Sequence, residues 1–362
     1  MNLYEEFQIL EREKSSFYYD KVNYKPVSNL CYAWKFIEEY FKAGEKESVL
    51  NNTYLSELKD NGKHIHTVSM YFLGILFRKL FEDKVKNHLI SSLKNQLSYR
   101  YDFTYSWFIT CLFHDYSWIQ ENDKFYNKEF SDTDSCFTKN VIEKLHIQHI
   151  IFRHKLIDGD AFKTHYREET IKNYFHYRCD YCKKADHGII AGILLFDRLT
   201  KNYNKKWKEF VISNPNHQQS HEYFIHDDLA WRREHLDHFA YIADSIMSHN
   251  IWLGTDETVY KKYHLEEILV GKVSKINIKD NPLLFALGLL DTIEPIKVFT
   301  EFNPKYVWSN ITMTTEANKI IIHVSEKAIF NYLEWFKKIQ SLKDWLDVRI
   351  QIGERNIEIE FI

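Results

Sequence analysis

The chain has little of the residues that interrupt or cross-link regular structure. Its 362 residues include only 10 Gly, 5 Pro and 5 Cys. So little Gly and Pro argues against a disordered protein and favours a compact one. An odd number of cysteines in a chain this long does not indicate a disulfide framework, which favours a reducing, cytoplasmic environment.

Long apolar runs and an excess of one charge are also missing. The longest apolar runs, at 70–77, 189–196 and 282–290, fall far short of the ~18 residues that span a bilayer. The first residues, Met1-Asn-Leu-Tyr-Glu-Glu, do not resemble a signal peptide. A formal charge of −3 gives no general attraction to nucleic acid or to an anionic membrane. We therefore expect a soluble cytoplasmic protein without membrane contact.

Aromatic residues are abundant, and helical periodicity runs to about residue 300. The 26 Phe, 24 Tyr and 9 Trp favour a compact, mainly helical body. The spacing of apolar residues predicts helices at the following places: from His66 to Leu80, over 104–120, over 139–155, from His187, over 227–252 and from Pro282. Segments 121–138 and 213–221 are polar and predict loops. The basic run 201–208, with its interleaved aromatic residues, is compatible with nucleic-acid binding, but a solvated helix end explains it at least as well.

The periodicity changes after about residue 305. Segments 311–315 and 320–324 are β-rich, 327–345 has helical spacing, and 348–352 with 357–361 predicts a terminal hairpin. We expect a mainly α protein in three parts. N-terminal helices (1–60) would cover a helical core domain (61–300), and a small ββαββ appendage (305–362) would follow.

One His-Asp pair, His114-Asp115, lies in the apolar run Trp107-Phe-Ile-Thr-Cys-Leu-Phe-His-Asp-Tyr-Ser-Trp118. Burial of an imidazole and a carboxylate is costly unless a metal ion or a partner charge holds them. Four more residues lie in comparable apolar frames: His66, His187, His249 and Asp291. Four imidazoles and two carboxylates suit divalent Mn, Fe, Ni, Zn or Mg. With one bridging carboxylate, six such ligands can hold two ions, which activate a hydroxide and neutralise a phosphoryl group.

Several alternatives stay open at individual positions. His64 competes with His66 as the first ligand, and His238 competes with His249 on the same predicted helix face. Cys179-Asp-Tyr-Cys182 with His176 is a weak indication of zinc, because a lone CxxC lacks a second pair. His217 and His221 fit a solvated surface pair. Tyr116 and Trp118 lie close enough in sequence to the His-Asp pair to contact a base.

The order of these motifs resembles the HD superfamily of metal-dependent phosphohydrolases. The matching motifs are His66, Phe113-His114-Asp115, Asp186-His187-Gly188-Ile-Ile-Ala191, Ala243-Asp-Ser-Ile-Met-Ser-His249-Asn250, and Leu289-Leu-Asp291-Thr-Ile-Glu-Pro295. These five short motifs cover roughly residues 60–297 and resemble the two-metal members. The resemblance implies that His66, His114, Asp115 and Asp291 hold one ion. Asp115 would then bridge to a second ion that is held by His187 and His249.

The sequence departs from this resemblance directly after the pair. Many members have Gly-Lys there, whereas this chain has Tyr116-Ser-Trp118. Lys183, Lys184 or Arg153 would have to replace the lysine in catalysis. The implied activity is hydrolysis of a phosphodiester or phosphoanhydride bond in a nucleotide or nucleic acid by a two-metal-activated hydroxide. The alternatives are a catalytically silent nucleotide sensor that regulates a partner, and a nuclease within a larger assembly.

Overall fold

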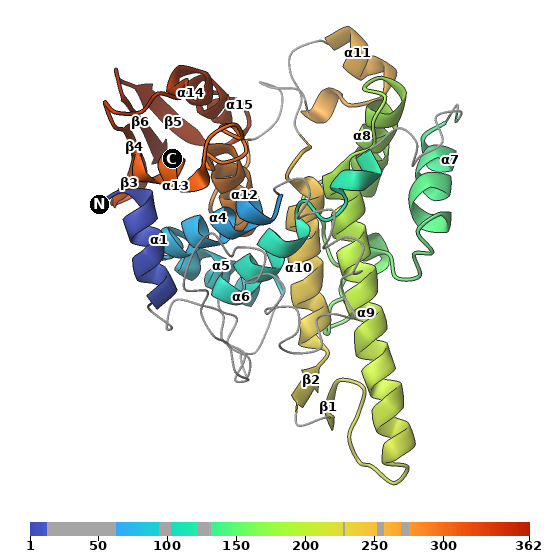
Figure 1. The fold of residues 1–362 in the computed structure, drawn as a ribbon. Coiled ribbons are helices and arrows are strands. Elements are labelled where there is room, and N and C mark those ends of the chain that lie inside the picture. The colour runs from blue at the N-terminus through green and yellow to red at the C-terminus, as the bar shows by residue number, and fades with distance from the viewer. Residues whose placement is uncertain are drawn as a thin grey trace. The chain divides into compact units, whose positions relative to one another are not determined.

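The computed structural model describes residues 1–12, 63–93, 103–121, 130, 132–226, 229–251, 257–268 and 275–362. These residues are mainly helical and end in a small α+β part (Figure 1), which confirms the predicted class at that level. None of the described helices has the length and apolar character required to cross a membrane.

The α-helices, in chain order, are α1 (Leu3–Arg12), α4 (Lys63–Leu76), α5 (Arg78–Ser92), α6 (Phe103–Phe113), α7 (Thr133–Phe137), α8 (Glu168–Asp180), α9 (His187–Ser213), α10 (Glu234–Ser248), α11 (Glu257–Lys262), α12 (Pro282–Ile293), α13 (Pro304–Ser309), α14 (Tyr332–Gln340) and α15 (Leu342–Trp345). Shorter turns are the 3-10 helices η4 (Trp118–Glu121), η6 (Ile151–Arg153) and η7 (Glu266–Ile268) and the π-helix η5 (Thr138–Glu143). The strands are β1 (Tyr223–His226), β2 (Leu229–Arg232), β3 (Ile311–Glu316), β4 (Lys319–Val324), β5 (Val348–Ile352) and β6 (Asn356–Phe361).

The chain forms two compact units. The first comprises Met1–His88, Tyr101–Leu112 and Ser274–Ile362, and the second comprises Leu89–Arg100 and Phe113–Val273. The boundary therefore falls at the last residue of α6. Each unit is assembled from segments that lie far apart in the sequence. The expected division into three consecutive parts (1–60, 61–300 and 305–362) stays a prediction.

The first unit contains an antiparallel sheet with the order β3-β4-β6-β5. Every second residue of β4 and β6 is buried, as expected for a sheet with one face against the core. Phe361 in β6 packs against Phe285 of α12, with ring centroids 5.3 Å apart. Phe7 of α1 lies 5.4 Å from Phe72 of α4, centroid to centroid, and closes the same core. The order of two strands, helix and two strands expected for the C-terminal part is confirmed, while its separation as an appendage stays a prediction.

The second unit is organised around α9 and α10, which lie side by side (Figure 1). The Asp186 side chain accepts a hydrogen bond from Ile189 N at 2.9 Å, and so caps the start of α9. At the far end of α9, the β1–β2 hairpin buries Phe224 against Tyr203, Phe210 and Leu236. The predicted start of a helix at His187 is confirmed.

Several element predictions were wrong in part. Over the expected helix 139–155, only the π-helix Thr138–Glu143 and the 3-10 turn Ile151–Arg153 form, and the helix expected from His66 to Leu80 is divided between α4 and α5. The helix expected over 104–120 ends at Phe113, because Tyr116 N and Trp118 N bond back only three residues and turn the chain. The helix expected over 227–252 begins only at Glu234, since Leu229–Arg232 pairs with β1 and helps to cover Phe224. The expected loop 121–138 contains α7, which begins at Thr133 because Asp132 caps Ser135 N.

Candidate metal centre

His66 lies one turn into α4 and is buried in the first unit. Its Nε2 atom is 3.2 Å from Asp291 Oδ1, in the last turn of α12. Its Nδ1 atom is 2.9 Å from Glu294 Oε2. The ring is therefore oriented by a carboxylate at Nδ1 and presents Nε2 to a second carboxylate, the arrangement that usually surrounds a metal-bound histidine. The side chain of the alternative ligand, His64, lies outside the described residues.

Glu294 is fully buried and holds the His66 ring in place through a hydrogen bond. In addition to His66, it accepts hydrogen bonds from Ser69 Oγ at 2.6 Å and from the backbone N of Ile296 and Lys297 at 2.9 and 3.0 Å. A buried carboxylate is tolerated when it is bonded in this way. The Lys297 side chain turns back and pairs with Asp291 Oδ2, so a cation lies beside a candidate ligand.

The end of α6 belongs to the surroundings of Asp291. Burial, and then the negative charge of Asp291, hold the pKa of the Cys111 thiol well above its usual value. Cys111 is in the last turn of α6, three residues before His114. His114 and Asp115 follow α6 directly, and both are buried.

The Asp115 carboxylate faces two different imidazoles. Its Oδ2 atom lies 3.5 Å from His114 Nε2, and its Oδ1 atom lies 3.3 Å from His187 Nε2. One carboxylate whose two oxygens point at two histidines can bridge two ions, because each oxygen is then paired with a different imidazole ligand. The sequence motif alone does not contain this information.

His187, the first residue of α9, is held at its other nitrogen by Glu121 at the end of η4. The distance from His187 Nδ1 to Glu121 Oε1 is 2.5 Å. Two cations stand near Glu121: Arg178 Nη2 is 3.7 Å from Oε1, and Lys184 Nζ is 3.7 Å from Oε2. Burial acts to raise the pKa of Glu121, but the bond to His187 and the positive charges of His187, Lys184 and Arg178 together outweigh it, so the pKa is lowered and the carboxylate stays ionised.

His249 directly follows α10 and is not on the helix as predicted. Its Nδ1 atom bonds to Ile246 O at 2.6 Å, which leaves the lone pair on Nε2. Its ring centroid is 5.4 Å from that of His187 and 6.0 Å from that of His114. The missing side chain of Gly188 makes room for this ring, since a Cβ there would be 2.9 Å from His249 Cε1 and Nδ1.

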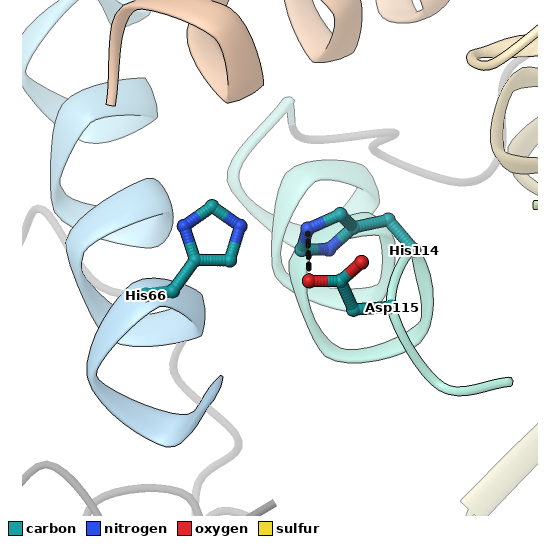
Figure 2. A group of neighbouring side chains, drawn as sticks. All are labelled: His66, His114 and Asp115. Carbon is teal, nitrogen blue, oxygen red and sulfur yellow. Dashed lines mark ion pairs between the residues drawn. The ribbon is translucent and has the colours of Figure 1, made fainter. Parts of the chain in front are cut away.

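Figure 2 shows His66 on α4 and the His114-Asp115 pair just after α6. One ligand atom from each of these three buried residues lies within 4.8 Å of the other two. Among the described residues, this is the group with the composition and spacing that can hold a metal ion. Imidazole nitrogens and a carboxylate oxygen are suitable donors for Mn, Fe, Ni or Zn.

Burial and nearby carboxylates have opposite effects on the two best-defined histidines. Burial lowers the pKa of His66, but Asp291 and Glu294 more than offset this, so the pKa is raised. Burial likewise lowers the pKa of His187, but Glu121, Asp115 and Asp186 raise it above its usual value. Both histidines therefore lie in negative surroundings, which favour a bound cation.

Three basic residues were expected to replace a lysine after the His-Asp pair, and they differ in their exposure and contacts. Lys183 has a side chain that is 64 % exposed and pairs with Asp180, while Arg153 is exposed at the end of η6. Lys184 approaches the centre only through Glu121. Their catalytic roles stay predictions. Lys297 contacts a candidate ligand directly, and sequence reasoning missed it.

The other candidate residues named from the sequence make contacts with neighbouring protein groups. Arg198 covers the ring of the buried Tyr116 at 5.1 Å, so this face cannot stack on a base. His238 is fully buried, and burial lowers its pKa to about 3. The Cys179 thiol makes a hydrogen bond with the Cys136 sulfur, and His176 Nδ1 lies 3.1 Å from Thr133 Oγ1. These contacts account for both residues without zinc.

Comparisons of this chain with protein-family models, with curated proteins and with solved structures gave no match.

Proposed function

We propose that the chain is a two-metal phosphohydrolase of the HD type. One divalent ion would be held by His66, His114, Asp115 and Asp291, and the second by Asp115, His187 and His249. The proposal requires that the carboxylates of Asp115 and Asp291 face the same ion in the folded protein.

One observation carries the proposal: the two oxygens of Asp115 face two imidazoles, at 3.5 Å (His114) and 3.3 Å (His187). Oxygen and nitrogen ligands of one ion, each about 2.0–2.2 Å from it, are expected to stand about 3 Å apart. The pairs around Asp115, and His66 with Asp291 at 3.2 Å, have this separation.

The outer hydrogen bonds give independent support. Three of the four histidines bond through Nδ1 to an acceptor: Glu294, Glu121 and Ile246 O. Metal-bound histidines nearly always donate their second nitrogen to a carboxylate or carbonyl, which fixes the tautomer and the ring direction.

A pair of divalent ions, when bound, lowers the pKa of water and neutralises negative charge on a phosphoryl group. The chain supplies the rest. Asp115 and Asp291 give the centre carboxylate charge, and Glu121 and Glu294 fix the imidazoles. Lys297, which pairs with Asp291, would supply positive charge to phosphoryl oxygens or to a leaving oxygen. We assign this role to Lys297 in preference to Lys183, Lys184 or Arg153, because Lys297 contacts a proposed ligand.

The substrate class follows from this chemistry. We expect the hydrolysed bond to be a phosphodiester or phosphoanhydride in a nucleotide or nucleic acid. The test uses protein stripped with a chelator and reloaded with Mn²⁺ or Ni²⁺. Hydrolysis is then measured on a model phosphodiester, a nucleotide panel and single-stranded DNA. We expect turnover of at least one of these by the wild type and none by the double variant His114→Ala with Asp115→Ala. Lys297→Ala should retain the metal and lose about 10²-fold or more in kcat.

His217→Ala is the matched control, because His217 lies outside the proposed ligand set. It should keep both metal and activity. If the wild type retains its metal but hydrolyses nothing while binding a nucleotide, the catalytically silent sensor replaces this proposal. If the double variant is as active as the wild type, the assigned centre is wrong.

A further inference from the structure

Asn250 occupies a position that the proposed ligand set leaves unexplained. Its side-chain Nδ2 atom lies 2.9 Å from His187 Nε2. In the neutral ring that can bind a metal, His187 Nδ1 donates to Glu121 and the Nε2 atom carries the lone pair. The Asn250 amide therefore donates to the same lone pair that the second ion would use.

Two tyrosines hold the backbone carbonyls of Asn250 and of the next residue. Tyr174 Oη donates to Asn250 O at 2.7 Å, and Tyr166 Oη donates to Ile251 O at 2.9 Å. Tyr174 is buried, and it comes from α8. The turn after α10 is thus held by two tyrosines, and Asn250 can change its partner only by rotating its side chain.

When an ion takes the His187 lone pair, the Asn250 amide loses its acceptor. A partly buried donor without a partner is costly, so the site should offer it another oxygen. We propose that Asn250 is a substrate-binding residue whose amide N–H donates to a phosphoryl oxygen. The inference rests on the proposed function and adds a residue that recognises phosphate. Tyr174 is then a positioning residue, which sets the amide through the backbone.

The alternative is that Asn250 turns its Oδ1 atom to the ion and becomes a ligand itself. The two roles predict opposite results. A phosphate-binding amide can be removed without loss of metal affinity, whereas removal of a ligand weakens the metal. Replacement by aspartate keeps an oxygen for the ion but replaces the donor with a negative charge.

The experiment measures Mn²⁺ binding, and then the binding of inorganic phosphate to the Mn²⁺-loaded protein, by titration calorimetry. Asn250→Ala should bind Mn²⁺ within about 2-fold of the wild type and bind phosphate about 10-fold or more weakly, because a bond to a charged group is lost. Asn250→Asp should retain Mn²⁺ and bind phosphate more weakly still. Tyr174→Phe should weaken phosphate binding by a smaller factor.

Asn204→Ala is the matched control, since Asn204 is also a partly buried asparagine that contacts histidines, His149 and His221. It should leave both constants unchanged. Wild-type phosphate affinity in Asn250→Ala would overturn the inference alone, and so would weakened Mn²⁺ binding in that variant. Failure of the wild type to bind Mn²⁺ would refute the proposed function itself. If Asn250→Ala does not fold, the near-isosteric Asn250→Leu, which also lacks both the donor and the ligand oxygen, decides the matter by the same two constants.

Discussion

Gly188→Ala is a small change that should separate metal binding from folding. A Cβ at this position would lie 2.9 Å from Cε1 and Nδ1 of His249 and 3.0 Å from Ile246 O. Carbon atoms in contact prefer about 3.5–4.0 Å, so the ring must move by several tenths of an ångström. The His249 ring cannot move without disturbing its bond to Ile246 O.

The cost to stability should be small. Overpacking of this kind costs about 1–3 kcal/mol, and alanine in place of glycine within a helix returns about 1 kcal/mol. We expect the free energy of unfolding of the metal-free protein to fall by about 2 kcal/mol or less. Metal affinity is more sensitive to this shift than stability is, since the distances between a metal and its ligands tolerate a change of only about 0.2 Å. The second ion should therefore bind at least about 10-fold more weakly, the usual cost of disturbing the residues around a metal ligand.

Urea unfolding and Mn²⁺ titration of the same preparation give both quantities. Gly192→Ala provides the contrast, because its Cβ would lie 2.4 Å from Ala243 O on the backbone of α10, away from the proposed ligands. That variant should lose much more stability than Gly188→Ala. Unchanged affinity for both ions in Gly188→Ala would refute the placement of His249 as a ligand.

Three further variants test the stability of particular contacts. Glu294→Gln should lower metal affinity about 10–100-fold and the free energy of unfolding by about 1–3 kcal/mol. The reason is that an amide cannot accept all of the hydrogen bonds that this carboxylate accepts. Unchanged metal affinity by calorimetry and unchanged stability in urea would contradict this. Burial raises the pKa of Asp244 from 3.8 to about 7, so the protonated carboxyl contributes stability below its unfolded pKa, and this is lost as the pH rises to about 7. The slope approaches about 1.4 kcal/mol per pH unit, and urea titrations of Asp244→Asn across this range should lack it. Gly74→Ala should lower the melting temperature strongly, because a Cβ would meet the buried Trp107 ring at 1.8 Å; a wild-type melting curve would show that the ring is placed incorrectly.

Much of the fold was predictable because its local sequence agrees with its final surroundings. Asp186 before His187 and Asn281 before Pro282 are residue types typical of helix caps, and both cap the first turn. Alternation of apolar residues in the last strands predicted the terminal sheet. The hairpin at 229–232 was missed because its pairing with β1 and the burial of Phe224 depend on distant residues.

The candidate ligands were found through their apolar frames, whereas their supporting residues were not. Glu294 and Glu121 lie next to a proline and a polar segment, where an exposed carboxylate is the ordinary expectation. Their bonds to His66 and His187 exist only in the folded chain. Lys297 was missed for the same reason, since its contact with Asp291 depends on the turn after α12. No periodicity in the sequence marks such contacts.

The central claim is that Asp115 bridges two metal ions. Its most direct test is the metal content of the folded wild type and of Asp115→Ala, measured by mass spectrometry after equilibration with Mn²⁺ and removal of loosely bound ions. We predict two ions per chain in the wild type and loss of both in the variant, since neither ion keeps its shared carboxylate. Less than one ion per chain in a well-folded wild type, or two ions retained by Asp115→Ala, would contradict the claim.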